Sequence, residues 1–438
     1  MKFDYTHALG ITGQQIEIYS KTLSPYMHTL ATASGAENYS SPETSLALLH
    51  DAKMLKEISS ITSTLKTKVL KYVFVIGVGG SSLGARAVYE AVRSSFHQTF
   101  VGNEIFPQAV FVDTLDIHVL ERAILILQNS VRSPEEVAFC LMSKSGATLE
   151  TLADFSIIET IARRRWGDSI HSRIVVVTTK QSVLWEECQK NNYRVVAMPE
   201  AVSGRFSVFS AAGLLPLSLA GINIDALLEG ARKGRDFSLS ASKNPALISA
   251  SILFEYYRQG IRIHDSFFFR VELETLGKWY RQLVSESLGK TRDVNNHLIR
   301  SGITPTVSIG PADLHSVAQL LIGGPRDKAV TFIGVQSFTT DYEIHSRDLG
   351  VGIVGPLAGT KVSKVVEALY EGTKKACEEG DIPFMEIQLT DVSEYSIGEY
   401  MQHKMVEVML LGQLMHINTF DQPSVESYKE AARKLLRE

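Results

Sequence analysis

The sequence predicts an α/β protein with two doubly wound domains, mainly parallel sheets and a C-terminal helix. Three observations support this. Short, nearly continuous apolar runs recur along the chain, segments with helical spacing separate them, and the alternation occurs twice. Strands that are apolar on both faces belong to parallel sheets that helices cover on both sides.

The composition is that of a globular protein. At about 150 residues per domain, 438 residues predict two or three domains. Hydrophobic residues make up 45% and charged residues 21%, which argues against a mainly disordered or fibrous chain. The net charge of −4 disfavours a nucleic-acid binder with a broad basic surface. A small anionic substrate remains compatible with it, because a local site can oppose the global charge.

The cysteines and the apolar runs indicate a compartment. Cys140, Cys188 and Cys377 are too few and too scattered for a disulfide framework or a cysteine-based zinc site, so a reducing compartment is expected. The first residues do not read as a secretory signal. The longest apolar stretch, 211–224, is interrupted by proline and serine and is shorter than the roughly 20 residues of a membrane span. We expect a cytoplasmic protein without membrane or nucleic-acid partners.

The first half of the chain predicts one α/β domain. Residues 1–45 read as helix and loop without a clear strand, and residues 46–215 form the first domain. A helix is expected where five apolar residues share one face: Leu149, Leu152, Ala153, Ile157 and Ile161. Strands are expected at 72–76, 109–112, 138–142, 174–179 and 194–198.

The second half repeats the alternation in residues 216–417. Helices are expected around 243–260 and 272–288, and strands at 304–310, 329–335, 350–355 and 384–389. Residues 418–438 close the chain with a helix. Asp421 is its expected N-cap, and Pro423 is tolerated in a first turn.

The segment GVGGSSLG (77–84) follows a strand and opens a helix. Its glycines let the backbone approach a ligand, and a helix N-terminus favours an anion. It is not a dinucleotide fingerprint, because Ser81 or Ser82 stands where a glycine is needed, and the Walker lysine is absent. A dehydrogenase is therefore disfavoured. The segment predicts phosphate or hydroxyl binding, here through Gly80 and Ser81, or else a tight turn without a ligand.

A second loop of this kind is SKSGATLET (143–151). Ser143, Ser145 and Thr148 place three hydroxyl groups at a strand-to-helix turn, which suits a dianionic phosphate without a metal. The alternative is simple helix capping. Ligands of open α/β sheets bind at the carboxyl ends of the strands, where both loops lie, so phosphate is the preferred interpretation.

The helix predicted over 274–288 has a buried stripe and a polar pair. Gln282 and Glu286 are four residues apart and share a face, and Gly289 ends the helix. Glu286 would lie in the last turn, where the negative end of the helix dipole raises its basicity. A solvated glutamate at a helix end is the alternative. The stripe comprises Leu276, Tyr280, Leu283 and Val284.

Three further charged or titratable side chains have both a functional and an ordinary interpretation. His315 lies in the first turn of a helix after a strand, where a structural histidine is common. Arg205, between a glycine and an aromatic residue, could face an anion or pair with a carboxylate. Lys429 lies on the terminal helix, where a surface charge is the ordinary case. The sequence has no zinc-type spacing and no EF-hand loop, so no metal and no cofactor are predicted.

Taken together, these segments resemble the glucose-6-phosphate isomerase family, in its shorter bacterial type. SGRFSVFSAAGL is similar to the family's GGR-[FY]-S signature, and NTFDQPSVESYK to N-x-F-D-Q-x-G-V-E-x-x-K. QLVSESLGK is similar to Q-x-x-x-E-S-x-G-K. IGVGGSSLG, SKSGATLET and DLHSVAQ match further blocks in the family's order. The resemblance covers about residues 70–430.

The resemblance implies two sugar-isomerase (SIS) type domains, a C-terminal helical arm and a homodimer with shared active sites. Glu286 then matches the base that moves the proton between sugar carbons, and Arg205 the arginine beside the enediolate. His315 matches the ring-opening histidine, which in the family comes from the partner subunit, and Lys429 matches the lysine near the ring oxygen. Substrate-binding positions are Gly80, Ser81, Ser143, Ser145, Thr148, Gln282 and Gln422.

The sequence departs from the family pattern at specific positions. Ser203 replaces the first glycine of GGR, Ser424 replaces the glycine of the FDQ tail, and Lys404-Met405-Val406 stand in place of the usual Tyr-Glu-His. No catalytic group is lost. The implied activity is aldose–ketose isomerisation between glucose 6-phosphate and fructose 6-phosphate.

Two alternatives remain open. One is an isomerase of another phosphosugar, such as mannose 6-phosphate or an amino sugar, although an amino-sugar isomerase would not be expected to carry the FDQ tail. The other is a non-catalytic phosphosugar-binding regulator. A regulator could keep the hydroxyl loop and lose Glu286, His315 and Lys429, and all three residues are present.

Overall fold

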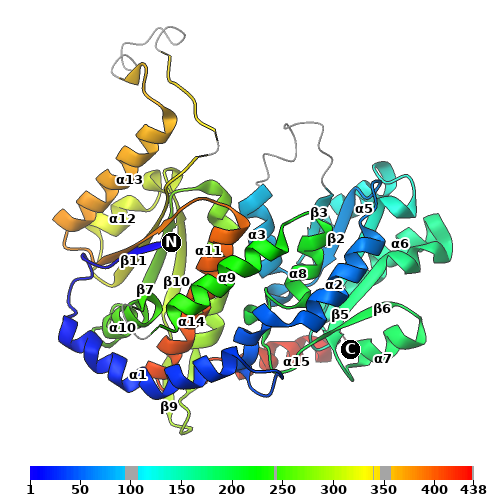
Figure 1. Cartoon of the computed structure of the whole chain (residues 1–438), viewed down its shortest axis with the longest axis horizontal. Coiled ribbons are helices and arrows are strands. Elements are labelled where there is room, and N and C mark those ends of the chain that lie inside the picture. Colours follow the sequence, from blue (N-terminus) through cyan, green and yellow to red (C-terminus); the bar gives the residue numbers. More distant parts are fainter. Residues whose placement is uncertain (94–106, 241–243, 339, 346–356, 437–438) are drawn as a thin grey trace.

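The computed structural model describes residues 1–93, 107–240, 244–338, 340–345 and 357–436. The described chain forms two five-stranded sheets side by side, each covered by helices on both faces, and a small two-stranded sheet (Figure 1). The predicted α/β class with mainly parallel sheets is confirmed.

The first sheet has the strand order β3-β2-β4-β5-β6 and is parallel throughout. Alternate residues of β2 enter two different cores. Val73 and Val75 pack in the core shared with α2, α3 and α8, whereas Phe74 and Ile76 pack with α5 and α6. The five predicted strands are thus confirmed. The bounds are β2 Tyr72–Ile76, β3 Gln108–Val112, β4 Val137–Met142, β5 Ile174–Thr179, β6 Arg194–Met198, α2 Ala52–Leu65, α3 Leu83–Arg93, α5 Ile117–Asn129, α6 Leu149–Trp166, α7 Val183–Lys190 and α8 Ala211–Leu219.

The second sheet has the order β1-β12-β11-β7-β10, and only β1 is antiparallel to its neighbour. Helices α10, α11 and α14 share the core of one face, while α13 and its neighbours cover the other. The bounds are β1 Lys2–Asp4, β7 Ile263–Phe268, β10 Thr304–Ile309, β11 Lys328–Val335, β12 Phe384–Leu389, α1 Gly13–Ser34, α9 Ile224–Ser238, α10 Pro245–Arg258, α11 Glu274–Leu288, α12 Ala318–Gly323, α13 Val362–Glu379, α14 Glu394–Leu414 and α15 Glu426–Leu435.

Several elements differ from the expectation. Neither β1 nor β7 was predicted, although β7 is flanked on both sides in the second sheet. Strands β8 (Lys290–Arg292) and β9 (Leu298–Ser301) form a hairpin that was also missed. Asp421 is not a helix N-cap, because its carboxylate pairs with Lys290 instead. The strand expected at 350–355 lies outside the described residues.

Helix α14 carries a buried charge cluster into the core. Glu407 accepts hydrogen bonds from Lys404 Nζ at 2.8 Å, from Tyr280 Oη at 2.7 Å and from Ser249. Both charged side chains are almost fully buried. Burial alone would raise the pKa of Glu407, but Lys404 and the hydrogen bonds hold it at about 2. The cluster ties α10 and α11 to α14.

Helices α3 and α11 pack against each other and join the two units. Glu90 of α3 accepts a hydrogen bond from Thr275 of α11 and another from Arg86 Nε, the latter at 2.7 Å. Arg86 also pairs with Asp113 at 3.0 Å. The position of the domain boundary stays a prediction, and residue 215 lies inside α8. Among the described residues, no helix is long and apolar enough to cross a membrane.

Candidate active site

Both predicted ligand loops lie where the strand order of the first sheet reverses, between β2 and β4. The chain leaves β2 toward β3 on one side, and it leaves β4 toward β5 on the other. Ligands of open α/β sheets bind in the crevice at such a switch point. Residues 77–82 follow β2 and residues 143–148 follow β4, so the two loops are neighbours at the carboxyl end of the sheet.

The loop after β2 approaches another backbone segment very closely. Gly79 has a φ of +62°, and the turn Gly79–Ser81 leads into α3. A Cβ atom added to Gly80 would lie 2.4 Å from the carbonyl carbon of Gly204. Glycine is therefore required at position 80, because it lets this loop touch the segment that carries Arg205. Ser81 ends the turn and is half-buried.

The loop after β4 gathers its three hydroxyl groups. Thr148 Oγ1 lies 3.2 Å from Ser143 Oγ and 3.4 Å from Ser145 Oγ. Gly146, at a φ of +65°, makes the turn, and α6 begins directly after Thr148. The first amide groups of a helix have no intrahelical acceptor, so they can bind an anion beside these hydroxyls. Burial lowers the pKa of Lys144 in this loop, and nearby Arg205 acts in the same direction.

Arg205 is the centre of the site and is buried, with 1% of its side chain exposed. Its Nη1 atom donates to Glu286 Oε2 at 3.1 Å and to Gln422 Oε1 at 2.7 Å. Its Nε atom donates to Ser287 Oγ at 2.9 Å, and Nη2 donates to the carbonyl oxygen of Thr419 at 2.7 Å. Burial lowers the pKa of Arg205, but a guanidinium remains protonated in proteins.

Glu286 and Gln282 lie on one face of α11, as predicted. Gln282 Nε2 donates to Glu286 Oε1 at 2.8 Å, so each carboxylate oxygen of Glu286 has one donor. Gln282 Oε1 is buried without a partner among the described residues. A Cβ atom on Gly79 would lie 3.4 Å from Gln282 Nε2, which joins this face to the loop after β2. The buried stripe and the helix end at Gly289 are confirmed.

Sequence reasoning missed Lys290 and Ser287 as members of the site. Lys290 Nζ donates to the carbonyl oxygen of Glu286 at 2.8 Å and pairs with Asp421 Oδ1 at 3.1 Å. Ser287 accepts from Arg205. Both residues lie in the segment QLVSESLGK. The available signal was a lysine placed directly after a helix-ending glycine, where a cation can reach free helix carbonyls.

Two predicted residues lie outside this cluster. His315 ends a short helix, Ala312–His315, beyond β10 and is exposed, and its side chain has no hydrogen bond or ion pair to any described residue. Lys429 on α15 pairs with Glu426 at 2.7 Å. The contacts within one described chain thus unite Gly80, Gln282, Glu286, Arg205 and Gln422, but they do not include His315 or Lys429.

The departures from the family pattern fit the local geometry. Ser203 has an ordinary φ of −75°, so a side chain is tolerated there, although its Oγ atom is buried without a partner among the described residues. Ser424 Oγ lies 3.5 Å from Thr291 Oγ1 of the hairpin. Neither serine has a positive φ, so neither position requires glycine for its backbone conformation.

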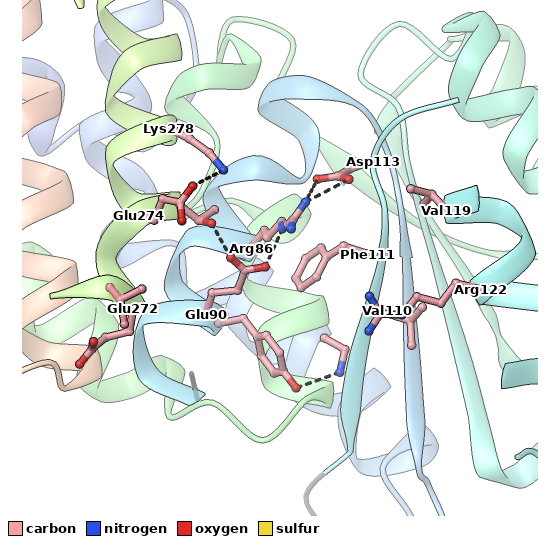
Figure 2. A pocket seen from close by; sticks show the side chains of 14 residues that line it. Arg86, Glu90, Val110, Phe111, Asp113, Val119, Arg122, Glu272, Glu274 and Lys278 are labelled. Carbon is pink, nitrogen blue, oxygen red and sulfur yellow. Dashed lines mark hydrogen bonds and ion pairs between the residues drawn. The ribbon is translucent and has the colours of Figure 1, made fainter. Parts of the chain in front are cut away.

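A separate cavity of about 400 Å³ lies at the opposite end of α11 (Figure 2). Arg86, Glu90 and Asp113 line it from the first unit, and Glu274 and Lys278 line it from the second. Most of these charged groups pair with one another, as the dashed lines in Figure 2 show. The cavity contains none of the predicted site residues.

The comparisons with known proteins agree on one family. The model of the phosphoglucose isomerase family matches residues 49–438. A glucose-6-phosphate isomerase of Methanocaldococcus jannaschii is 34% identical over 368 residues, which are 84% of either chain. The glucose-6-phosphate isomerase of Bacillus anthracis is 30% identical over 441 residues, covering 99% of this chain and 95% of that protein.

Solved structures share the fold. A hypothetical protein of Thermus thermophilus aligns with a TM-score of 0.87 at 28% identity and covers 99% of both chains. A glucose-6-phosphate isomerase of Chlamydia trachomatis aligns with a TM-score of 0.80 at 20% identity, covering 97% of this chain and 86% of that one. Because the family model matches residues 49–438, and sequence relatives at 30–34% identity cover 84–99% of the chain, the chain belongs to the phosphoglucose isomerase family.

Proposed function

We propose that this protein interconverts glucose 6-phosphate and fructose 6-phosphate as an aldose–ketose isomerase of glycolysis and gluconeogenesis. The observation that carries the proposal is the Arg205–Glu286 pair beside the hydroxyl loop. A carboxylate held by a buried guanidinium and an amide can take a proton from carbon, and the guanidinium can stabilise the anion that forms.

The proton transfer is assigned to Glu286. In the open-chain sugar, this carboxylate removes the proton from C2, which gives a cis-enediolate, and the same carboxylate returns the proton to C1. Arg205 lies against the carboxylate and provides a fixed positive charge for the enediolate oxygens. Gln282 and Gln422 contact these two side chains and limit their orientations. No redox cofactor is needed, since the two sugars are isomers.

Phosphate binding is assigned to the loop 143–148, with Gly80 and Ser81 beside it. Three hydroxyl groups and the first amides of α6 suit the oxygens of a dianion. Binding at this remote group helps to hold the reacting carbons against Glu286. This loop would bind the phosphate of any phosphosugar. The assay of activity must therefore compare phosphosugars that differ in the sugar.

Ring opening is assigned to His315 and Lys429, and we infer a homodimer in which His315 enters the site of the other subunit. Two observations support this. The His315 side chain is exposed and makes no hydrogen bond or ion pair to another described residue, and no described contact links it to Glu286 of its own chain. We also infer a cytoplasmic location, in keeping with three buried free cysteines.

The activity is tested with a coupled assay that follows glucose 6-phosphate formed from fructose 6-phosphate. Mannose 6-phosphate is the comparison substrate, and Glu286→Gln is the inactive control. A clear preference for the glucose–fructose pair supports the proposal. If only another phosphosugar is converted, the protein is an isomerase of that sugar. If fructose 6-phosphate binds but is not converted, the protein is a phosphosugar-binding regulator.

The shared site is tested by mixing two inactive chains. A Glu286→Gln chain refolded together with a His315→Ala chain forms heterodimers in which one site has both groups intact, so part of the activity should return. Heterodimers that form and stay inactive would contradict the shared site. A monomeric protein by light scattering would contradict the homodimer.

A further inference from the structure

We propose that Lys290 is a positioning residue for the isomerase site, in that its buried ammonium group fixes residues 421–422 against the end of α11. This inference rests on the proposed function. Lys290 is not among the residues to which the resemblance gives a role. Its ammonium group does not contact the side chains of Glu286 or Arg205. It contacts the backbone carbonyl oxygen of Glu286 and the residue Asp421.

The placement of Lys290 is unusual for a lysine. Only 4% of its side chain is exposed, and burial lowers the pKa of its amino group. Lysine is rarely so buried unless it is paired. Here the Nζ atom has three acceptors, namely the carbonyl oxygen of Glu286 at 2.8 Å, Asp421 Oδ1 at 3.1 Å and the carbonyl oxygen of Asp421. The three donor hydrogens of an ammonium group match this number.

The first acceptor connects Lys290 to the base. Glu286 lies in the last turn of α11, where carbonyl oxygens have no intrahelical donor. Lys290 follows the helix-ending Gly289 and returns its ammonium group to the carbonyl of Glu286. The backbone of the residue that carries the base is therefore held by a charge-assisted hydrogen bond.

The other two acceptors connect Lys290 to the C-terminal segment. Arg205 Nη2 also contacts the carbonyl oxygen of Asp421, at 3.2 Å, so two buried cations converge on one peptide group. The next residue, Gln422, is the one whose side chain reaches Arg205 at 2.7 Å. If Lys290 is removed, the hold on Asp421 is weakened, and with it the direction in which Gln422 points.

Residues before and after this point are held differently. Phe420 packs on Phe206, with ring centroids 5.3 Å apart, so residue 420 has an apolar anchor of its own. Helix α15, in contrast, has no buried side chain among its described residues. Between Phe420 and Lys429, the chain is therefore held by the buried contacts of Asp421 and Gln422 and by one long, exposed contact of Ser424 with Thr291. Loss of Lys290 should loosen the chain from residue 421 onward and leave the part before it in place.

The test compares Lys290→Met, which keeps the length of the side chain without donors, with Lys290→Arg, which keeps charge and donors. Lys278→Met is the matched control, because Lys278 lies on α11, the helix whose end Lys290 contacts, in an exposed pair with Glu274. We expect Lys290→Met to lower kcat about 10- to 100-fold with a smaller change in KM, since small misplacements in a site have effects of this size. Lys290→Arg should recover most of the loss, and Lys278→Met should behave as wild type.

Hydrogen exchange of the ligand-free protein supplies a readout that does not depend on activity. In Lys290→Met, peptides from residue 421 onward should exchange faster, while those covering 412–420 stay as in wild type. Unchanged exchange, or faster exchange with wild-type kcat, would overturn the proposal. Should Lys290→Met not fold, Lys290→Gln takes its place under the same criteria. An inactive wild-type protein with the expected exchange pattern would count against the proposed function and not against the role of Lys290 in holding this segment.

Discussion

Four strands of each sheet follow the same order, but the two sheets contribute different chemistry. Read from the edge, the first runs β3-β2-β4-β5 and the second β10-β7-β11-β12, so each has one switch point between its two inner strands. In the first sheet this point carries glycines and hydroxyl groups. In the second it holds a cavity of about 370 Å³ that aromatic rings and the carboxylates Glu367 and Glu371 help to line.

The second unit contributes to the site through the far end of a helix. Glu286 comes from the C-terminal turn of α11, which points back to the switch point of the first sheet. A shared topology therefore does not give two equivalent sites. In the proposed function, the first unit binds the phosphate and the second provides the base. The four predictions below compare the two units, two through the proposed site and two through buried charges, and they start with the largest expected effect.

Replacing the base should abolish chemistry and leave binding intact. We expect Glu286→Gln to lower kcat about 10²- to 10⁴-fold, since the amide keeps the shape but cannot accept a proton. KM should change little. In D₂O, deuterium entry at C1 of fructose 6-phosphate should be lost while anomer interconversion persists. Deuterium entry at C1 near the wild-type rate would mean that another residue is the base, and it would contradict the assignment of the base to the second unit.

The buried charge pair of the second unit should be a strong determinant of stability. Glu407→Gln leaves Lys404 buried without its counterion, which costs about 3–5 kcal/mol of unfolding free energy. Urea denaturation measures this loss. The double variant Lys404→Met/Glu407→Gln is the control and should recover most of it, because neither charge remains. A single variant as stable as wild type would contradict the assigned role of the cluster.

Removing hydroxyl groups from the first unit should weaken binding and spare chemistry. Ser145→Ala and Thr148→Ala, made separately, should each raise KM for fructose 6-phosphate about 10- to 100-fold, because one charge-assisted hydrogen bond contributes about 1.5–3 kcal/mol. Ser169→Ala, at an exposed turn, is the control. Activity should be unaffected by EDTA. An unchanged KM, or strong inhibition by the chelator, would place the phosphate elsewhere or require a metal.

A carboxylate of the first unit lacks the partners that Glu407 has. Asp154 on α6 is buried, and neither of its oxygens has a partner among the described residues. Burial, with Glu150 and Asp113 nearby, raises its pKa to about 6. The folded protein thus holds this proton more tightly than the unfolded chain, so this group costs stability as the pH rises from about 4 to 6, and the cost persists above.

Asp154→Asn should therefore stabilise the protein at pH 8 and much less at pH 4.5. The gain is expected to be about 1 kcal/mol, because the amide also remains buried without partners. Thermal unfolding at the two pH values measures it, and Asp168→Asn, at an exposed carboxylate, is the control. An equal shift at both pH values would mean that the charge of Asp154 is not the cause.

The sequence predicted the first unit better than the second, for a physical reason. The strands of the first sheet are apolar on both faces, so each one appears in the sequence as a continuous apolar run. Strand β7 reads IHDSFF, and its polar residues are buried with partners: His264 Nε2 lies 2.8 Å from Thr331 Oγ1, and Asp265 accepts from Ser308 at 3.1 Å. Such partners come from distant parts of the chain, so the segment does not resemble a buried strand locally.

The site was predicted to the extent that its residues lie in contiguous motifs. The hydroxyl loop and the pair Gln282–Glu286 follow from local spacing. The role of Lys290 depends on Asp421, more than a hundred residues later, and no local pattern indicates that contact. Asp421 was assigned to a helix cap for the same reason, since a cap is the local interpretation of an aspartate before proline.

The pairing of β1 with β12 has a consequence for how the protein is made. Phe3 lies opposite Ile387, so β1 pairs with a strand that is synthesised more than 380 residues later. The unit of residues 46–215 can complete its own sheet meanwhile. The second unit takes strands from both sides of the first in the sequence, β1 before it and β7 to β12 after it. Arg205 of the first unit can bind Gln422 only once residue 422 has been synthesised. During synthesis, the loops 77–82 and 143–148 can thus form well before the cluster around Glu286 is complete, so on the proposed function a nascent chain has its phosphate-binding loops before it has its base.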